Sequence, residues 1–200
     1  MPELDVIMIG GSAGALEALL AILPELPAAF TVPIVVVLHL PPAQPSLLPD
    51  VLSRACRRRV AEIEDKMALL PQTIHVAPPN YHVLLERDRT IALSVDPPVH
   101  FSRPSIDVAF DAAADSFGRT AAGVLLSGAS EDGARGLARI HRAGGPALIQ
   151  DPASARHPEM PAAAVRWVGP GAQVHLLPEL ASAVSALGGI LMTSHQDCAR

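Results

Sequence analysis

Short apolar runs, each ending at turn residues, constrain the fold of this chain more than any other feature. Four of them, DVIMI, IVVVL, AGVLL and ALIQ, occupy residues 5–9, 34–38, 122–126 and 147–150. Such unbroken apolarity is typical of parallel strands that helices cover on both faces. Segments with apolar residues at helical spacing lie between the runs. The alternation predicts an α/β fold, with a doubly wound, mostly parallel sheet and helices on both faces.

The middle of the chain predicts a smaller element. Extended segments at residues 73–77, 82–86 and 90–95 are separated by turn residues, which indicates a small antiparallel hairpin. A helix is expected over residues 105–117, with Ser105 in position to cap its N-terminus. Another is expected over residues 46–59.

Size and composition limit the classes of protein to consider. The chain has 200 residues, half of them apolar and 18% charged, which fits one compact globular domain. We expect this domain to span residues 1–190, with residues 191–200 as a C-terminal tail. The formal charge of -5 and the absence of a long basic run argue against nucleic-acid binding. The short cluster Arg57-Arg58-Arg59 is either a solvated helix end or a small patch for an acidic partner.

The sequence predicts a soluble, cytoplasmic protein. No export signal is present at the N-terminus, and no apolar run reaches the ~18 residues of a membrane span. Cys56 and Cys198 lie far apart and lack the spacing of metal ligands, which suits a reduced compartment. We therefore expect no membrane insertion.

A glycine-flanked serine follows the first predicted strand. Gly10-Gly11-Ser12-Ala13-Gly14 fits the G-x-S-x-G pattern, in which glycines permit a strained turn that exposes a serine hydroxyl at the start of a helix. Glycine turns at helix N-termini also bind phosphate, so this alternative stays open. The spacing does not match the G-x-G-x-x-G dinucleotide pattern or the G-K-[ST] phosphate-loop pattern.

Two further residues follow strands at the same edge of the predicted sheet. His39 comes directly after residues 34–38, where an imidazole is well placed to be a general base. Asp132 lies in the loop after residues 122–126, where a carboxylate can orient an imidazole or cap a helix. Because the carboxyl ends of parallel strands meet at one edge, we expect Ser12, His39 and Asp132 to converge as a catalytic triad. Their order in the chain differs from that of the α/β-hydrolases.

At these residues the sequence resembles the catalytic domain of the chemotaxis protein-glutamate methylesterases, the CheB type. The resemblance rests on IGGSAG, VVVLHLPP and LLSGASEDGARG, and it continues through VAPPNYHVLL, SRPSIDVAFDAAA and IQDPASARHPEMPAAAV. It covers residues from about 5 to 187. The family often has Thr in place of Ala13 and Met in place of Ala129, changes that leave backbone donors in place but alter the fit of a substrate.

The resemblance implies a serine hydrolase acting in chemotaxis and signal transduction. It implies Ser12 as the nucleophile, His39 as general base and acid, Asp132 as the group that orients His39, and the amides near Ala13 and Ala129 as oxyanion donors. The implied reaction is hydrolysis of glutamate γ-methyl esters with release of methanol, with deamidation of receptor glutamines as a second activity. The implied partners are the cytoplasmic helices of methylated chemoreceptors or receptor-like proteins. Members usually carry an N-terminal receiver domain, whereas this sequence begins at the first predicted strand, so we expect no receiver domain in this chain. The alternatives are a constitutive enzyme, regulation by a separate receiver protein, or a domain excised from a longer chain.

The remaining polar residues allow weaker predictions. Arg103, Tyr81 and His82 are candidates for lining a substrate cleft, although an ion pair for Arg103 and an internal hydrogen bond for His82 are the structural alternatives. The other histidines lack metal-ligand spacing, so we expect no metal and no cofactor. Two functions stay open beside the esterase: a non-catalytic module that binds a receptor or partner, and a phosphate or nucleotide binder.

Overall fold

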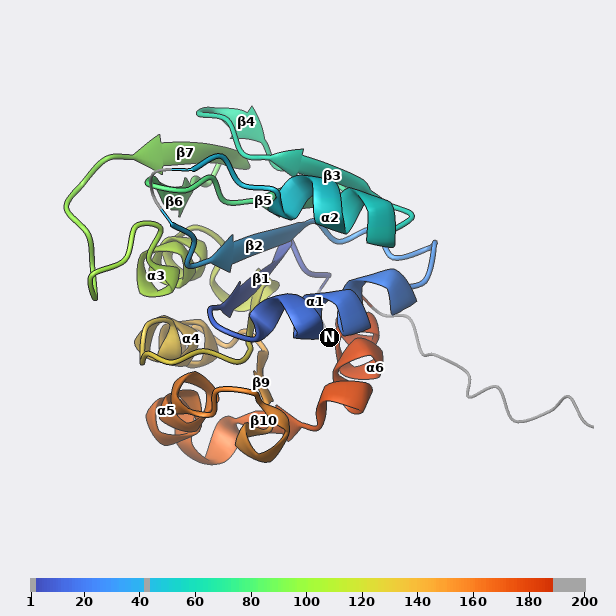
Figure 1. The fold of residues 1–200 in the computed structure, drawn as a ribbon, viewed down its shortest axis with the longest axis vertical. Coiled ribbons are helices and arrows are strands. Elements are labelled where there is room, and N and C mark those ends of the chain that lie inside the picture. Colours follow the sequence, from blue (N-terminus) through green and yellow to red (C-terminus); the bar gives the residue numbers. More distant parts are fainter. Residues whose placement is uncertain (1–2, 42–43, 189–200) are drawn as a thin grey trace, which may run out of the picture.

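A computed structural model describes residues 3–41 and 44–188 of the chain, and a parallel sheet forms its centre (Figure 1). Seven strands of the described residues pair in the order β10-β9-β8-β1-β2-β5-β3, and every pairing is parallel. The strands are β1 (Val6–Gly11), β2 (Ile34–Leu38), β3 (Arg59–Glu62), β5 (Thr73–Val76), β8 (Ala121–Leu125), β9 (Ala147–Gln150) and β10 (Gln173–His175). Residues of β1, β2 and β8 are all buried, as their unbroken apolarity predicts.

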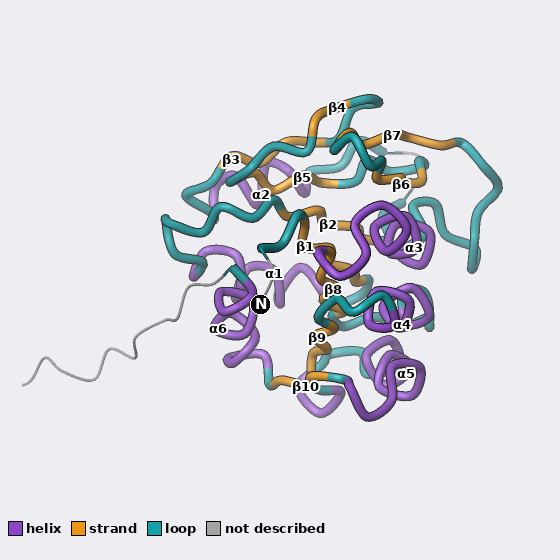
Figure 2. The backbone as a smooth tube through the Cα atoms, turned by 180° about the vertical axis from the view of Figure 1, so that it is seen from behind, coloured by secondary structure: helices purple, strands orange, loops and turns teal. Residues whose placement is uncertain are grey.

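Helices cover both faces of this sheet, as Figure 2 shows from behind. One apolar core joins the sheet to α1 (Ala15–Ile22), α2 (Leu48–Ala55) and α6 (Leu177–Leu187). A second core, on the opposite face, joins it to α3 (Ile106–Phe117), α4 (Ala134–Arg142) and α5 (Glu159–Val168). The prediction of a doubly wound α/β fold is confirmed.

A small antiparallel sheet completes the second core. β6 (His82–Leu85) and β7 (Thr90–Ser94) form the predicted hairpin, and β4 (Met67–Ala68) pairs with the other edge of β7. Val83, Leu85 and Ile91 are buried in the same core as the apolar residues of α3. This sheet and the loop that follows it bring residues 95–105 to the carboxyl ends of the parallel strands.

The segment after α2 differs from the prediction. The helix ends at Ala55 because Cys56 is extended, and Arg59 begins strand β3. Arg58 donates hydrogen bonds to the carbonyl oxygens of Phe30 and Pro27 and lies 5.3 Å from the centre of the Phe30 ring. The basic cluster is therefore not a solvated helix end, since its middle arginine ties two loops together.

The predicted helix over residues 105–117 is confirmed as α3, and Ser105 caps it through a bond from the amide of Val108. None of the described helices has the length and apolar character required to span a membrane. The predicted tail, residues 191–200, lies outside the described residues.

Candidate active site

The strand order reverses beside β1, and the predicted site residues lie at this point. β1 has β2 on one side and β8 on the other, with α1 and α4 leaving toward opposite faces. Loops after the carboxyl ends of such strands enclose the ligand crevice of doubly wound folds. Ser12 follows β1, His39 follows β2, and Asp132 lies in the loop after β8.

Ser12 begins the turn that joins β1 to α1. Its amide donates to the carbonyl of Ser127 at 2.9 Å, and its own carbonyl accepts from the amide of Ala15 at 3.0 Å. The left-handed residue of this turn is Gly14, with a φ of 81°, and not the serine. The turn therefore presents a partly exposed Ser12 at the helix start without the positive φ at the nucleophile position that a strained serine elbow would need.

The register of the sheet places Ser12 beside His39. Gly11 pairs with Leu38, and the amide of His39 donates to the carbonyl of Gly11 at 3.3 Å. Ser12 directly follows Gly11 and His39 directly follows Leu38, and neighbouring strands lie about 4.8 Å apart. Both residues line one cavity of about 360 Å³.

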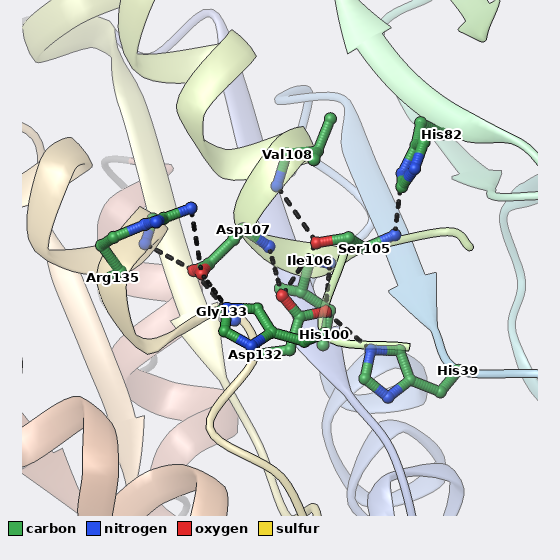
Figure 3. Close-up of polar contacts among 11 residues, drawn as sticks. His39, His82, His100, Ser105, Ile106, Asp107, Val108, Asp132, Gly133 and Arg135 are labelled. Atoms are coloured by element: carbon green, nitrogen blue, oxygen red, sulfur yellow. Dashed lines mark hydrogen bonds and ion pairs between the residues drawn. The ribbon is translucent and has the colours of Figure 1, made fainter. Parts of the chain in front are cut away.

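His39 and Asp132 form a direct hydrogen bond (Figure 3). Nε2 of the imidazole lies 2.8 Å from Oδ2 of the carboxylate, which is fully buried, whereas the side chain of His39 is 15% exposed. A carboxylate partner favours the tautomer with its proton on Nε2. In that tautomer Nδ1 is the basic nitrogen.

Asp132 is held by the N-terminus of α3. Its Oδ1 accepts from the hydroxyl of Ser105 at 2.8 Å and from the amide of Asp107 at 3.1 Å, and its Oδ2 accepts from the amide of Ile106 at 2.7 Å. Burial raises the pKa of Asp132, but these bonds and the one from His39 outweigh burial and hold the pKa below its usual value. The carboxylate therefore stays ionised beside the imidazole.

The capping alternative for Asp132 is correct in part. The residue at the N-cap of its own helix, α4, is Gly133, with a φ of 91° and no side-chain cap. Asp132 instead receives amides from the first turn of α3. It contacts a helix N-terminus and His39 at once.

Asp107 is a residue that sequence reasoning missed. Its Oδ1 accepts from the amides of Gly133 and Gly136 at 3.0 and 2.7 Å, while its Oδ2 lies 3.5 Å from Arg135 and from His100. The two aspartates thus exchange caps: Asp132, which precedes α4, accepts from amides at the start of α3, and Asp107, which lies in α3, accepts from amides at the start of α4. Burial raises the pKa of Asp107, although the Gly136 amide opposes this shift. The sequence did offer one indication of this role, since Asp107 is an acidic residue in the first turn of a predicted helix.

One atom of each of His100, Asp107 and Asp132 lies within 4.8 Å of the others, a spacing that a metal ion tolerates. The surroundings suit hydrogen bonding better. Backbone amides already occupy both carboxylates, and the guanidinium of Arg135 faces Asp107 where a cation would bind. The arrangement is a network of helix caps and ion pairs.

The amides of Ala13 and Ala129, the predicted oxyanion donors, belong to neighbouring loops. Ser127 joins these loops to a third one, since its hydroxyl donates to the carbonyl of Ala13 at 2.8 Å and accepts from the amide of His157 at 2.9 Å. Within residues 3–41 and 44–188, neither candidate amide has a hydrogen-bond acceptor. Neither residue lines the cavity that contains Ser12 and His39, so their role as oxyanion donors stays a prediction.

The predicted cleft residues lie in different environments. Arg103 lines a cavity of about 140 Å³ beside His39, but its guanidinium donates to Asn80 and to the carbonyls of Val95 and Asp96. His82 is buried, with Nδ1 accepting from the amide of Ser105 and Nε2 3.2 Å from the carbonyl oxygen of Pro97. Tyr81 is exposed and lines neither cavity beside His39. His82 therefore forms the internal hydrogen bonds that were the alternative to a cleft position. The alternative for Arg103 was an ion pair, but its guanidinium bonds to two backbone carbonyls and to the side-chain amide of Asn80.

The fold and these contacts define a class: a doubly wound α/β domain in which a serine, a histidine and a buried aspartate meet where the strand order reverses. The family model described as CheB methylesterase matches residues 7–184. The chain belongs to the CheB methylesterase family, as the sequence motifs predict.

Curated relatives and a solved structure agree with this assignment. A protein of Leptospira interrogans is 42% identical over 161 residues, or 80% of this chain and 83% of its own length. Proteins of Trichodesmium erythraeum and Paraburkholderia xenovorans, both named protein-glutamate methylesterase/protein-glutamine glutaminase, are each 37% identical over 76% and 90% of this chain. The chain spans only 44% and 50% of those two proteins. The crystal structure of the Thermotoga maritima CheB methylesterase catalytic domain superposes with a TM-score of 0.85 at 25% identity, covering 92% of this chain and 99% of that one.

Proposed function

We propose that this chain hydrolyses glutamate γ-methyl esters on chemoreceptor proteins and releases methanol, with Ser12, His39 and Asp132 as its catalytic residues. The observation that carries the proposal is the 2.8 Å bond between His39 and the buried Asp132 at the strand end next to Ser12. The names of the curated relatives support the same ester chemistry.

Acylation begins at the Ser12 hydroxyl. Nδ1 of His39 accepts the hydroxyl proton while Oγ attacks the ester carbonyl. The amides of Ala13 and Ala129 donate hydrogen bonds to the oxyanion that develops. The tetrahedral intermediate then expels methoxide, which takes the proton from Nδ1 and leaves as methanol. A glutamyl ester of Ser12 remains.

Water completes the reaction by the same route. Nδ1 of His39 accepts a proton from water, hydroxide adds to the acyl carbonyl, and the returning proton restores the Ser12 hydroxyl. Asp132 stabilises the imidazolium at both steps because it is ionised and bonded to Nε2. A glutamine amide would react in the same way with ammonia as the leaving group, which accounts for the second activity in the relatives' names.

The partner in this proposal is a methylated helix from the cytoplasmic part of a chemoreceptor or receptor-like protein. Such a partner places the reaction in the cytoplasm and in chemotaxis signalling. A separate receiver protein is the corresponding proposal for regulation.

Methanol release from a methylated chemoreceptor fragment tests the function. Wild type is expected to release methanol, and Ser12→Ala is expected to release almost none at equal folded concentration. Ser46→Ala is the matched control, because Ser46 lines the same cavity but its hydroxyl accepts from the amide of Leu48 at 3.1 Å and has no role in the proposed chemistry. Wild type that binds the fragment without releasing methanol would favour a binding module. Wild type that binds inorganic phosphate at the α1 N-terminus and ignores the fragment would favour the phosphate binder.

A further inference from the structure

The loop between β7 and α3 contains a tight two-residue turn. Val99 and Ser102 exchange backbone hydrogen bonds of 2.9 and 3.1 Å across it. The two turn residues, His100 and Phe101, have φ angles of 49° and 61°. Positive φ at both positions defines a type I′ turn, whose usual residues are Asn and Gly.

His100 and Phe101 are poor residues for this turn. A side chain other than Gly, Asn or Asp is strained in the left-handed region, and strain of this kind concentrates where a site needs a particular side chain. Phe101 is also exposed to the full extent of its surface, at 104% of the reference area. Neither local conformation nor packing within the described residues explains a phenylalanine here.

The base of the turn is firmly held. The guanidinium of Arg103 donates to the carbonyls of Val95 and Asp96 at 2.6 and 3.0 Å and to Asn80 at 2.7 Å. Nε2 of the buried His82 lies 3.2 Å from the carbonyl oxygen of Pro97. A side chain on a fixed base loses little conformational entropy when it binds a partner.

The turn lies at the candidate active site. Phe101 lines the cavity of about 140 Å³ that also contains His39 and Leu40. His39 and Leu40 also line the cavity of about 360 Å³ that contains Ser12. A chain segment that delivers an ester to Ser12 and extends across His39 would pass from the larger cavity to the smaller one, which Phe101 lines.

We propose that Phe101 is a substrate-contacting residue that packs against an apolar side chain of the protein substrate next to the esterified glutamate. This inference rests on the proposed function, which supplies a macromolecular substrate. Exposed aromatic side chains on rigid bases are frequent anchors of protein interfaces. Phe101 sets the affinity for the protein, while Ser12, His39 and Asp132 perform the chemistry.

The test compares two substrates in the full chain. Methanol release is measured from a methylated chemoreceptor fragment, and hydrolysis of p-nitrophenyl acetate reports the chemistry without a protein contact. Phe101→Ala is expected to lower kcat/KM for the fragment about tenfold or more, chiefly through KM, because a phenylalanine ring is no longer buried on binding. Hydrolysis of the small ester is expected to stay unchanged. The control is Val95→Ala, an apolar residue of the same loop that is 69% exposed and lines neither cavity.

A stability measurement adds an independent outcome. Phe101→Gly is expected to raise the midpoint of urea unfolding, since glycine relieves the strain at φ 61° and no buried contact is lost. A variant that is more stable yet slower on the protein substrate alone would support the proposal.

Several results would overturn it. Equal kcat/KM for wild type and Phe101→Ala on the fragment, or an equal loss on both esters, would remove the contact. Sedimentation showing a wild-type dimer that dissociates in Phe101→Ala would assign the side chain to a second copy of this chain. Wild type that is inert on the fragment would refute the proposed function, and this inference with it.

Discussion

Replacing Asp132 by asparagine separates the two contacts of this side chain. The carboxylate accepts from backbone amides on each oxygen, from Asp107 on Oδ1 and from Ile106 on Oδ2. An asparagine amide has one acceptor oxygen and one donor nitrogen, so either orientation turns an NH₂ group against a backbone N–H. With the NH₂ group at the Oδ2 position, Nε2 of His39 must accept, which puts the proton on Nδ1, where the base should be.

The expected magnitudes differ for stability and for catalysis. One buried amide left unpaired costs about 1–3 kcal/mol in the free energy of unfolding. Loss of the charge and of the productive tautomer is expected to lower kcat by ~10⁴, as for other Ser-His-Asp triads. A residue that only caps α3 would show the first effect and not the second.

Methanol release at saturating substrate and urea unfolding measure the two effects on the same preparation. Ser105→Ala is the control, because it removes the 2.8 Å bond to Asp132 and the N-cap of α3 but leaves the bond to His39 in place. We expect Ser105→Ala to lose about 1–2 kcal/mol of stability and to keep most of its turnover. Turnover of Asp132→Asn within about tenfold of wild type would refute the role of Asp132 in catalysis, given the loss expected for a triad.

Three other predictions follow from single contacts. Gly14→Ala is expected to lower stability by about 1–2 kcal/mol for its left-handed φ, and further because the new Cβ would lie 2.7 Å from Oγ of Ser127. Gly144→Ala is the less crowded comparison in urea unfolding, since Gly144 has a φ of 89° and its new Cβ would lie 3.3 Å from the nearest atom, Cβ of Arg119. Ser127→Ala is expected to cost about 1–3 kcal/mol and to slow methanol release, since its hydroxyl holds the Ala13 and His157 loops; unchanged rates would show that these loops position nothing. Burial lowers the pKa of His75 in the folded protein. The stability that comes from its neutral form is therefore complete above the unfolded pKa of about 6.5 and is lost as the pH falls toward the lower folded pKa. The midpoint of urea unfolding should decrease between pH 7.5 and pH 5.5 in wild type, and should decrease less in His75→Gln.

The parallel core of the fold was predictable because its strands are buried on both faces. β1, β2 and β8 are continuous apolar runs, and each ends at a turn residue or a histidine. Once the strands were placed, the geometry of parallel sheets was enough to bring Ser12, His39 and Asp132 to one edge.

Edge elements and tertiary caps were not predictable in this way. β3 has the sequence RVAE and is partly exposed, so it shows no apolar run. β10 is likewise an edge strand with exposed residues. The exchange of caps between Asp107 and Asp132 joins residues 25 positions apart through the packing of α3 on α4. Spacing in the sequence carries no trace of such a contact.

The most direct test of the account is whether Ser12 and His39 act as one unit. Methanol release from the chemoreceptor fragment is measured for Ser12→Ala, His39→Ala and the double variant, all at matched folded concentration. Groups that act together are strongly non-additive, so the account predicts a double variant within about threefold of Ser12→Ala alone. If His39→Ala slows the Ser12→Ala enzyme by the same factor as it slows wild type, the two residues act independently and the proposed mechanism is wrong.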